Sequence, residues 1–409
     1  MRNMKKLLLI LVFAGLCAID ANAQKKIPDT HKTFIEQTVR RTDIILPQVK
    51  GYNCYKADLH IHTIYSDGDI TPRQRVREAW YDGLDIIALT DHLEARRYTQ
   101  NMLNALAPFN ADKKPYKYHP AGSARLLKDG TDPGITTDLN ATFAEAEECA
   151  KKEGYPLLLI KGSEISRKPQ TEGHFNALFI KDIQGIYDID TKKTFRNVHE
   201  QGGIVIHNHP AYRRKTTDKN EWHEEVYKEG LIDGVEIVNG INFYPKMIRR
   251  CIDEKLVMIG ATDTHRPTSG QYKDMGVFRT MTIIFAKECT ESAIKEALLK
   301  RRTIAYSGGS LMGEEKWLVA FLNAAIECKL TSTTAGKKNN SHMYTLTNNS
   351  SITFHLRRGG TIYKLEPFRT LTTSYTPNKE TGQVGRPKFT VENMWHIDYK
   401  HPVVELKID

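Results

Sequence analysis

Histidines and acidic residues recur in this sequence at the ends of short apolar stretches. His60 and His62 lie two apart within residues 56–62, so on a strand both side chains project from one face. Other candidates follow or begin later stretches: Asp67, Asp91, His92, Glu164, His174, His207, His209, Asp263 and His265. Imidazole nitrogens and carboxylate oxygens are good donors to Zn, Mn and Fe. The set exceeds what one tetrahedral ion can use, which predicts two or three divalent ions in a shared site.

The elements that would position these residues alternate between strand and helix. Strands are predicted at 56–62, 85–90, 157–160, 175–180, 204–206, 234–238 and 256–260, and helices at 71–83, 138–152, 191–200, from about 245, and at 290–301. This alternation favours parallel β/α units that close into a barrel. The carboxyl ends of such strands meet at one end of the barrel, where these folds place their chemistry. Residues 95–137 have no regular period and predict a long insertion over that end.

Residues of these types usually have ordinary structural roles when they occur singly. We expect hydrogen-bonded or exposed rings at His31, His119, His199, His223, His342, His355, His396 and His401. Asp138 is expected to cap a helix, and Glu236 to pair with a neighbouring barrel residue. For the strand-end set, chance would have to place every donor at the same end of successive strands, so a shared metal site is the better interpretation.

Composition indicates a folded chain with more than one part. Of 409 residues, 40% are hydrophobic and 26% charged, which excludes a wholly disordered chain and allows one large α/β domain with a smaller module. No stretch after residue 20 is apolar for long enough to span a membrane. After about residue 313, clusters of Thr, Asn, Ser, Lys and Gly separate short alternating stretches, which predicts a small antiparallel β module over 313–409.

The N-terminus has the pattern of a secretory signal peptide. Arg2, Lys5 and Lys6 precede an apolar run, and small residues at 21–23 fit a cleavage site. We therefore expect a signal peptide over 1–23, a lead-in over 24–51, and export to the periplasm or the medium. Cleavage would remove three positive charges and one negative from the net charge of +10, leaving +8. The remaining cysteines share no metal-binding spacing and are read as unpaired thiols, although disulfides would be compatible with export.

Several motifs, taken together, point to one family. They are Asp58-Leu59-His60-Ile61-His62-Thr63, Asp67-Gly68, Thr90-Asp91-His92, Gly162-Ser163-Glu164, His209-Pro210 and Asp263-Thr264-His265. In order and spacing they resemble the PHP (polymerase and histidinol phosphatase) superfamily. The resemblance covers residues 52–312. It implies an α/β fold, a distorted (β/α)7 TIM-like barrel, whose two or three divalent ions support cleavage of phosphate esters.

The resemblance also implies roles for individual residues. His60, His62, Glu164 and Asp263 would bind the first ion, Glu164, His174 and His209 the second, and Asp67, His92 and His265 the third. Glu164 would bridge two ions. His207 has no clear counterpart, and we read it as a supporting residue that could replace His209 as ligand or supply the leaving-group proton.

Two bound ions would explain how an anionic ester is attacked by water. About 3.5–4 Å apart, they would hold a bridging hydroxide and clamp the phosphoryl oxygens. The basic loop after His209 offers Arg213 as a bidentate phosphate ligand, with Arg214 as the substitute and Arg266 as a weaker candidate. A solvated basic loop is the alternative reading.

These observations favour an exported, metal-dependent small-molecule phosphodiesterase. A phosphomonoesterase or nucleotidase is the next reading. An oligonucleotide 5'-3' exonuclease is a further one, although no basic, aromatic-rich stretch suggests binding of single-stranded nucleic acid. A non-catalytic binding protein that uses the C-terminal module comes last, because the ligand set is intact. Metal identity and oligomeric state stay open.

Overall fold

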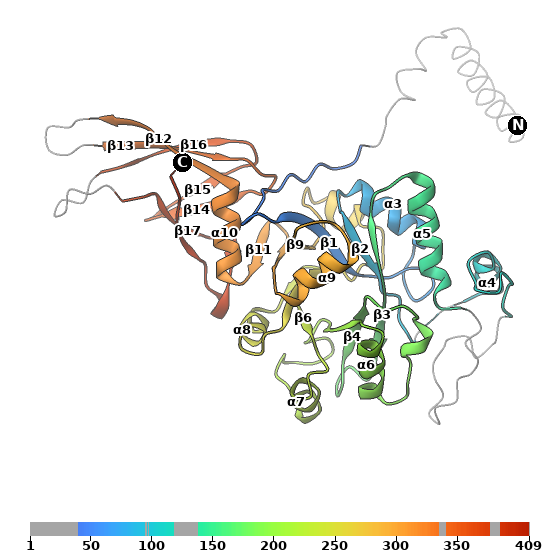
Figure 1. The fold of residues 1–409 in the computed structure, drawn as a ribbon. Coiled ribbons are helices and arrows are strands. Elements are labelled where there is room, and N and C mark those ends of the chain that lie inside the picture. The colour runs from blue at the N-terminus through green and yellow to red at the C-terminus, as the bar shows by residue number, and fades with distance from the viewer. Residues whose placement is uncertain are drawn as a thin grey trace, which may run out of the picture. The chain divides into compact units, whose positions relative to one another are not determined.

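A curled mixed sheet flanked by helices forms the larger part of the structure (Figure 1). The computed structural model describes residues 40–94, 96, 98–117, 138–334, 341–376 and 385–408. The predicted signal peptide, most of the predicted lead-in and residues 118–137 of the predicted insertion lie outside these described residues. All elements below belong to the unit Thr42–Asp409. The expected mixed α/β class is confirmed.

Within the described residues, the large sheet has the strand order β18-β11-β10-β9-β1-β2-β3-β4-β5-β6-β7, with β8 paired to β6. Its strands are β1 (Asn53–Ile61), β2 (Ile86–Leu89), β3 (Leu158–Ser166), β4 (His174–Leu178), β5 (Ile204–His207), β6 (Gly234–Asn239), β7 (Asn242–Phe243), β8 (Val257–Ala261), β9 (Met281–Ala286), β10 (Thr303–Ser307), β11 (Ser310–Gly313) and β18 (Met394–Trp395).

The strands are only partly parallel, which corrects the prediction of uniform β/α units. The pairs β1–β2, β2–β3, β5–β6 and β6–β8 are parallel. Strand β4 is antiparallel to β3 and β5, and β9 is antiparallel to β1 and β10. The segment 167–173 explains the first exception, because a parallel crossover needs about a dozen residues or more. Seven successive β/α units are therefore not confirmed.

The helices cover the sheet, and five of the eight α-helices in the described residues begin after a residue whose side chain caps the first turn. Thr71 caps the first of them, its hydroxyl accepting from the backbone of Gln74, whose side chain accepts from the Thr71 backbone in return. Thr71 immediately precedes the helix and Pro72 is its first residue, in agreement with the helix predicted over 71–83. The helices are α3 (Pro72–Tyr81), α4 (Gln100–Leu106), α5 (Ala141–Glu153), α6 (Thr191–Glu200), α7 (Glu221–Lys228), α8 (Pro245–Asp253), α9 (Glu291–Leu299) and α10 (Glu315–Ala325), with short turns η1 (Gln184–Ile186), η2 (Ser269–Lys273) and η3 (Ile397–Tyr399). Helix α4 lies in the stretch expected to lack regular structure.

Side-chain hydrogen bonds join β8 to β9 and β10. The hydroxyl of Thr282 on β9 donates to the carbonyl of Gly260 at 2.8 Å. Thr303 on β10 donates to the carbonyl of Met258 at 2.7 Å. Strand β8 also pairs with β6, so the sheet curls until β8 lies beside β9 and β10. This curvature brings the ends of β1 and β8 together, where the backbone of His62 donates to Thr264.

Two smaller antiparallel sheets follow α10. One is β12-β13-β16 and the other β15-β14-β17-β19. Their strands are β12 (Ile326–Thr334), β13 (Ser341–Asn348), β14 (Phe354–Arg358), β15 (Thr361–Leu365), β16 (Thr370–Tyr375), β17 (Lys388–Val391) and β19 (Val403–Glu405). Their antiparallel pairing agrees with the expected β module. One apolar core runs through α10 and both regions, containing Phe285, Phe321 and Phe354.

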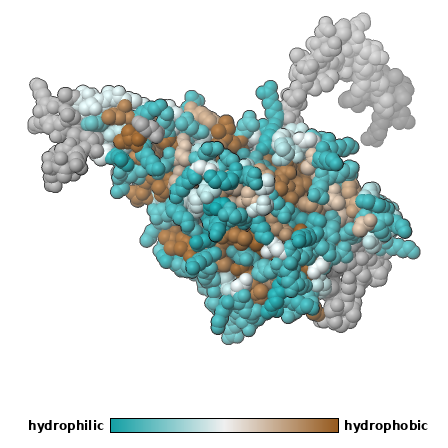
Figure 2. Space-filling view, viewed as in Figure 1, coloured by the Kyte–Doolittle hydropathy of each residue, from teal (hydrophilic) through white to brown (hydrophobic). Residues whose placement is uncertain are grey.

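The face of the molecule drawn in Figure 2 is mostly hydrophilic. In the view of Figure 2, hydrophobic residues form small separated patches among hydrophilic ones. Among the described residues, no helix combines the length and apolar character needed to cross a membrane.

Candidate metal centre

His60 and His62 bring two ring nitrogens together at the end of β1. Their Nε2 atoms lie 3.1 Å apart, and both rings are fully buried. Oδ1 of Asp263 lies 3.3 Å from Nε2 of His60 and 3.1 Å from Nε2 of His62. Asp263 follows β8, and its position is fixed by a backbone hydrogen bond to the carbonyl of His60 at 2.8 Å. These three side chains form one group that could hold a metal ion.

The carboxylate of Glu164 lies among five histidine side chains. Its carboxylate oxygens lie 2.7–3.5 Å from ring nitrogens of His60, His62, His92, His174 and His209. Glu164 itself is 1% exposed. A carboxylate that meets five imidazoles has the environment expected of a bridging metal ligand.

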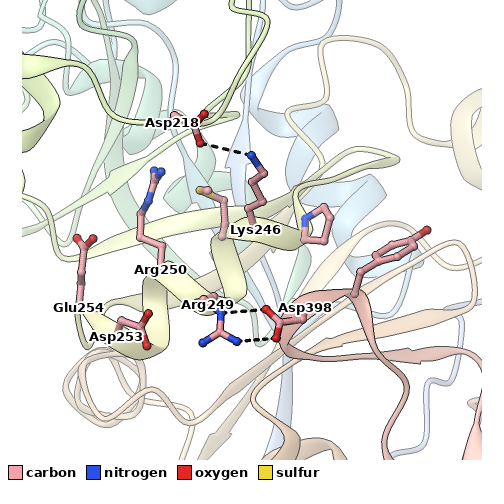
Figure 3. Close-up of a pocket in the computed structure, with 10 residues that line it drawn as sticks. Asp218, Lys246, Arg249, Arg250, Asp253, Glu254 and Asp398 are labelled. Atoms are coloured by element: carbon pink, nitrogen blue, oxygen red, sulfur yellow. Dashed lines mark hydrogen bonds and ion pairs between the residues drawn. The ribbon is translucent and has the colours of Figure 1, made fainter.

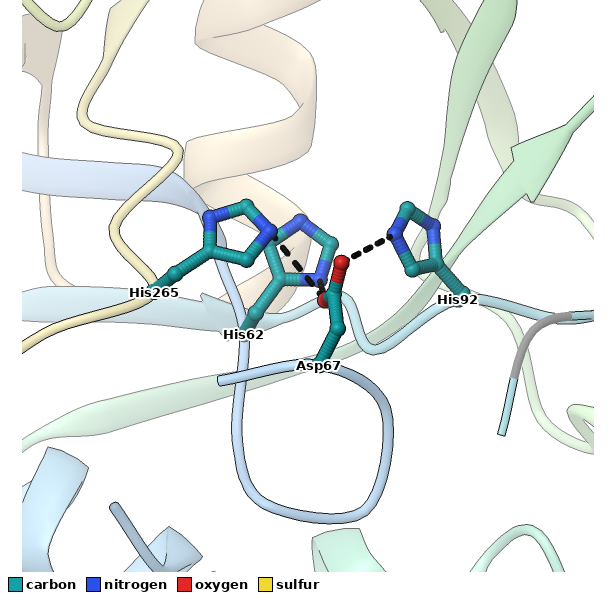
Figure 4. Close-up of side chains that lie close together, drawn as sticks. All are labelled: His62, Asp67, His92 and His265. Carbon is teal, nitrogen blue, oxygen red and sulfur yellow. Dashed lines mark hydrogen bonds and ion pairs between the residues drawn. The ribbon is translucent and has the colours of Figure 1, made fainter. Parts of the chain in front are cut away.

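A second group of donors surrounds Asp67 (Figure 4). Oδ2 of Asp67 lies 3.3 Å from Nε2 of His92, and Oδ1 lies 3.1 Å from Nε2 of His265. The ring of His62 stacks on that of His265, with centroids 4.3 Å apart. Gly68 permits the tight loop that carries Asp67, because a Cβ atom there would come within 2.7 Å of the His62 carbonyl.

Strand direction explains why residues from distant parts of the chain meet. His174 begins β4 rather than ending it, but β4 is antiparallel to β3, so its first residue lies at the edge where the parallel strands end. His209 and Asp263 have φ values of +24° and +53°, in the left-handed region that non-glycine residues rarely adopt. Such strained backbone is concentrated at functional sites.

Other polar side chains orient the donors, and the sequence analysis did not assign them this role. Glu236 on β6 was expected to pair within the barrel, and it does so with His60, from Oε1 to Nδ1 at 2.7 Å. Its Oε2 accepts from the backbone of His209 at 2.7 Å. Asn208 donates to Glu164 at 3.1 Å, and Asn239 donates to Asp263 at 3.2 Å. The only signal for Asn208 and Asn239 in the sequence was their proximity to strand ends.

Buried charges also fix the loops that carry the donors. Asp91 accepts hydrogen bonds from the backbone and hydroxyl of Thr63 at 2.7 and 2.8 Å, and from Ser66 at 2.6 Å. Arg75 on α3 is fully buried and donates to the carbonyls of His62, Thr264 and Arg266 at 2.7–3.0 Å. Nothing in the helical pattern of α3 distinguished Arg75 from its exposed neighbours, so sequence reasoning missed it.

Burial and the close approach of carboxylates and imidazoles shift the pKa values of the histidines and of Glu164 in opposing directions. Burial lowers the pKa of His60, but Asp263, Glu236 and Glu164 outweigh it and raise that pKa well above its usual value. The same competition raises the pKa of His92 to about 10. Burial would raise the pKa of Glu164, but the surrounding imidazoles hold it well below its usual range. Burial dominates at His62, whose pKa is lowered to about 4.

The structure does not bring His207 to the other donors, which corrects its expected place beside the ions. His207 lies two residues after Val205, so both occupy the face of β5 that packs toward α7. Its Nδ1 lies 2.8 Å from the hydroxyl of Tyr227, and its ring stacks on His223. Burial and the nearby cations hold the pKa of His207 well below its usual value, so the ring is neutral at pH 7.

The three arginines predicted to bind phosphate, Arg213, Arg214 and Arg266, differ in exposure and in the groups that they contact. Arg213 is exposed and packs over the ring of Tyr212, 5.4 Å from its centroid. Arg214 donates to the carbonyl of Asp218 at 2.6 Å. Arg266 is exposed just after His265. A pocket of about 270 Å³ is lined by His92, Glu94, Ser166, His174, Tyr212 and Arg213, so of the three arginines Arg213 is the one that lines it.

A separate pocket of about 380 Å³ lies at α8 (Figure 3). Lys246 pairs with Asp218 at 3.5 Å, and Arg249 forms a two-pronged pair with Asp398 at 2.6 and 2.9 Å. None of the histidines described above lines this pocket. The pocket is also not lined by Asp67, Glu164 or Asp263, so it is not the candidate site.

The donor set fits divalent cations. Lone pairs of two facing imidazole nitrogens and a carboxylate oxygen converge within hydrogen-bonding distances of one another, an arrangement that a shared cation would stabilise. The described residues contain three overlapping groups of this kind: His62 with Asp67, His92 and His265; His60 with Glu164 and His209; and His60 with His62 and Asp263. Every predicted ligand except His174 belongs to one of these groups, and Nδ1 of His174 lies 3.2 Å from Oε1 of Glu164.

Comparison with known proteins finds a PHP domain in this chain and a solved structure that contains a PHP-like protein. The PHP domain matches residues 58–241. A solved two-domain protein from Bacteroides vulgatus, which contains a predicted PHP-like metal-dependent phosphoesterase, is 30% identical, with a TM-score of 0.73 over 89% of this chain and 98% of that one.

Two other solved structures are more distant. A protein from Bifidobacterium adolescentis described as a metal-dependent phosphoesterase is 16% identical, with a TM-score of 0.36 over 60% of this chain and 96% of that one. An amidohydrolase from Chromobacterium violaceum is 14% identical, with a TM-score of 0.33 over 52% of this chain and 88% of that one. No protein with a curated description matches the chain.

Proposed function

This chain belongs to the PHP-like metal-dependent phosphoesterases, hydrolases that act on phosphate esters, and we propose that it is an exported phosphodiesterase for small molecules. The observation that carries the proposal is the position of Glu164. Its carboxylate lies within 3.5 Å of five imidazoles contributed by β1, β4 and the segments after β1, β2 and β5. Such a set can hold more than one cation around a single carboxylate.

We assign the ligands in three overlapping sets. His60, His62, Glu164 and Asp263 bind one ion, Glu164, His174 and His209 a second, and Asp67, His92 and His265 a third, with His62 in reach of the third set as well. When bound, the ions supply the Lewis acidity that activates water and offsets the charge on the phosphoryl oxygens. The chain's own contribution is to fix the donors. Glu236 and Asn208 do so through the hydrogen bonds described above.

Arg213 is the proposed phosphate-binding side chain. It lines the pocket that also contains His92 and His174, and its guanidinium can bind two phosphoryl oxygens at once. Arg214 is the weaker candidate, because it already donates to a backbone carbonyl. Arg266 is near the third ligand set and remains a second candidate. We assign no catalytic role to His207.

The test is hydrolysis by purified protein loaded separately with Mn²⁺, Zn²⁺ or Fe²⁺. We expect release of p-nitrophenol from bis(p-nitrophenyl) phosphate, loss of turnover after chelation, and recovery on adding back the ion. Arg213→Met should raise KM more than it lowers kcat, because a positioned cation is lost and the metal ligands are kept. Absence of turnover on both this diester and p-nitrophenyl phosphate, with every ion, would exclude the function.

A phosphomonoesterase is the second candidate. It is favoured by Arg213, because an additional cation beside His174 would offset the extra charge of a monoester dianion. The ratio of kcat/KM for p-nitrophenyl phosphate to that for the diester decides between the two. An oligonucleotide substrate is disfavoured by the small volume of the pocket, about 270 Å³, and degradation of a labelled oligonucleotide at physiological salt would contradict this.

Export is proposed from the N-terminal sequence. Fractionation of cells expressing the full chain should recover activity outside the cytoplasm, and N-terminal sequencing should begin at Gln24. Recovery of an unprocessed, cytoplasmic chain would contradict export without affecting the proposed chemistry.

A further inference from the structure

A pocket opens beside the proposed metal centre, and we propose that it binds a polyhydroxylated alcohol, the alcohol part of the phosphate ester, with Glu94 as its hydrogen-bond acceptor. This inference rests on the proposed phosphoesterase function and adds the substrate class. His92 and His174 line the pocket and are also proposed metal ligands, so a group bound there lies next to the reacting phosphoryl group.

Glu94 is a buried acceptor with one unused oxygen. The residue is 8% exposed. Its Oε2 accepts from the backbone of Ser166 at 2.8 Å. Its Oε1 is buried and has no hydrogen-bond partner among the described residues, although Nη2 of Arg167 lies 3.3 Å away in an ion pair. Buried carboxylate oxygens are normally hydrogen-bonded, so an acceptor that lines a pocket without a partner is suited to a donor from a ligand.

The ion pair with Arg167 decides which donor fits. Because the charge of Glu94 is already offset, a second cation such as an ammonium group gains little there. A hydroxyl group needs only the free lone pair and brings no charge. An alkyl chain would leave Oε1 buried without a partner, which is unfavourable. The pocket therefore selects hydroxyl groups over both alternatives.

Tyr212 supplies an apolar surface on the same pocket. It is 44% exposed, and its ring packs against the rings of His174 and His209, with centroids 5.4 and 5.0 Å away. A flat aromatic face suits the C–H side of a sugar ring. The volume of about 270 Å³ is slightly below the range of drug-sized sites, which fits one ring and not a chain of several.

The experiment compares esters that differ in the alcohol. Metal-loaded wild-type protein is assayed with glucose 6-phosphate, ribose 5-phosphate, glycerol 3-phosphate, butyl phosphate and p-nitrophenyl phosphate, each as the monoester and as its methyl diester. We expect kcat/KM for the hydroxylated alkyl esters to exceed that for butyl phosphate by about ten-fold or more, the effect of one hydrogen bond to a charged group. The two sugar esters and the glycerol ester separate a ring from a linear polyol.

Two variants test Glu94 directly. Glu94→Gln removes the charge, and Glu94→Asp withdraws the oxygen while retaining the charge. In both, the ratio of kcat/KM for the preferred hydroxylated ester to that for p-nitrophenyl phosphate should fall about ten-fold, mainly through KM. The contrasting variant is Asn208→Ala, which removes a donor 3.1 Å from Glu164 at a residue that does not line the pocket, and it should lower turnover of all esters without changing the ratio. Circular dichroism confirms that each variant is folded.

The outcomes separate this inference from the proposed function. Hydrolysis of p-nitrophenyl phosphate with no preference for hydroxylated over alkyl esters would overturn the inference alone. An equal loss on all esters in both Glu94 variants would do the same, because it would indicate a role in positioning His92. Failure of the wild type to hydrolyse any ester would instead overturn the proposed function.

Discussion

Oε1 of Glu236 lies 2.7 Å from Nδ1 of His60, and both side chains are completely buried. This contact leaves Nε2 of His60 facing His62 and Asp263. The other oxygen of Glu236 accepts from the backbone of His209. The carboxylate of Glu236 therefore orients two of the proposed ligands, His60 on β1 and His209 after β5. Such outer partners commonly fix the tautomer and direction of metal-binding histidines.

Replacing Glu236 by Gln should weaken metal binding. Gln has one acceptor oxygen where Glu236 uses two, so either His60 or the His209 backbone loses its partner. We expect metal affinity to fall about 10- to 100-fold, measured by competition with a chromogenic chelator. The control is Glu148→Gln on α5, whose side chain is 56% exposed and which should bind metal as the wild type does. Equal affinity in the two variants would contradict the orienting role of Glu236.

Glu164→Gln should remove bound metal and activity together. The carboxylate is the shared neighbour of five imidazoles, and the substitution leaves them without their central negative charge. We expect metal analysis of the purified variant to show loss of at least one ion per chain and turnover to fall by at least about 100-fold. A variant that retained the full metal content would show that Glu164 is not a bridging ligand.

Metal binding should release protons and weaken as the pH falls. In the metal-free site burial would lower the pKa of His92, but Glu164 and Asp67 raise it to about 10, so the ring is protonated at pH 7. An incoming ion must displace that proton, and affinity should rise with pH up to about 10. His62, with a pKa lowered to about 4, is already neutral at pH 7 and adds no such dependence.

Calorimetric titrations in buffers of different ionisation enthalpy measure this release. We expect at least one proton per chain at pH 7, and the same value in His199→Gln, a histidine that pairs with Asp233 away from the centre. Metal binding without proton release would contradict the raised pKa of His92.

Arg75 and Arg77 on α3 provide a matched pair for stability. Arg75 is buried and donates to three carbonyls of the loops that carry His62 and His265, so Arg75→Met should lower the free energy of unfolding by about 3 kcal/mol or more. The side chain of Arg77 is 50% exposed and pairs with Glu153, so Arg77→Met should change it by less than about 1 kcal/mol. Denaturant unfolding measures both. Similar midpoints for the two variants would exclude a structural role for Arg75.

Removing residues 326–409 should prevent folding of the remaining chain. Phe354 and Phe389 of the small sheets share one apolar core with Phe321 of α10 and Phe285 of β9. Strand β18 also pairs with β11, so the C-terminal region completes an edge of the large sheet. We expect the truncated chain to aggregate or to bind a hydrophobic dye, whereas residues 24–409 elute as a soluble species. A soluble truncated chain that still binds metal would show that the two regions fold independently.

The sequence by itself predicted which His, Asp and Glu side chains would lie together at one end of the sheet. Strand periodicity, the repeated appearance of His, Asp and Glu at strand ends, and the spacing of the PHP motifs were sufficient, because side-chain alternation and strand direction are local properties. The helix that begins at Thr71 and Pro72 was also determined locally, since a cap needs only its own first turn. The small antiparallel sheets followed from short alternating stretches in the same way.

Only the tertiary structure decided which polar residues support those donors. His207 and Glu236 both occupy strands near the expected site, but His207 faces α7 whereas Glu236 reaches His60. Arg75 has a helical neighbourhood like that of Arg77, and only the approach of distant loops gives it buried carbonyl partners. The antiparallel β4 was likewise decided by pairing. Which face of an element is covered, and by what, depends on contacts between segments far apart in sequence, and local periodicity does not contain that information.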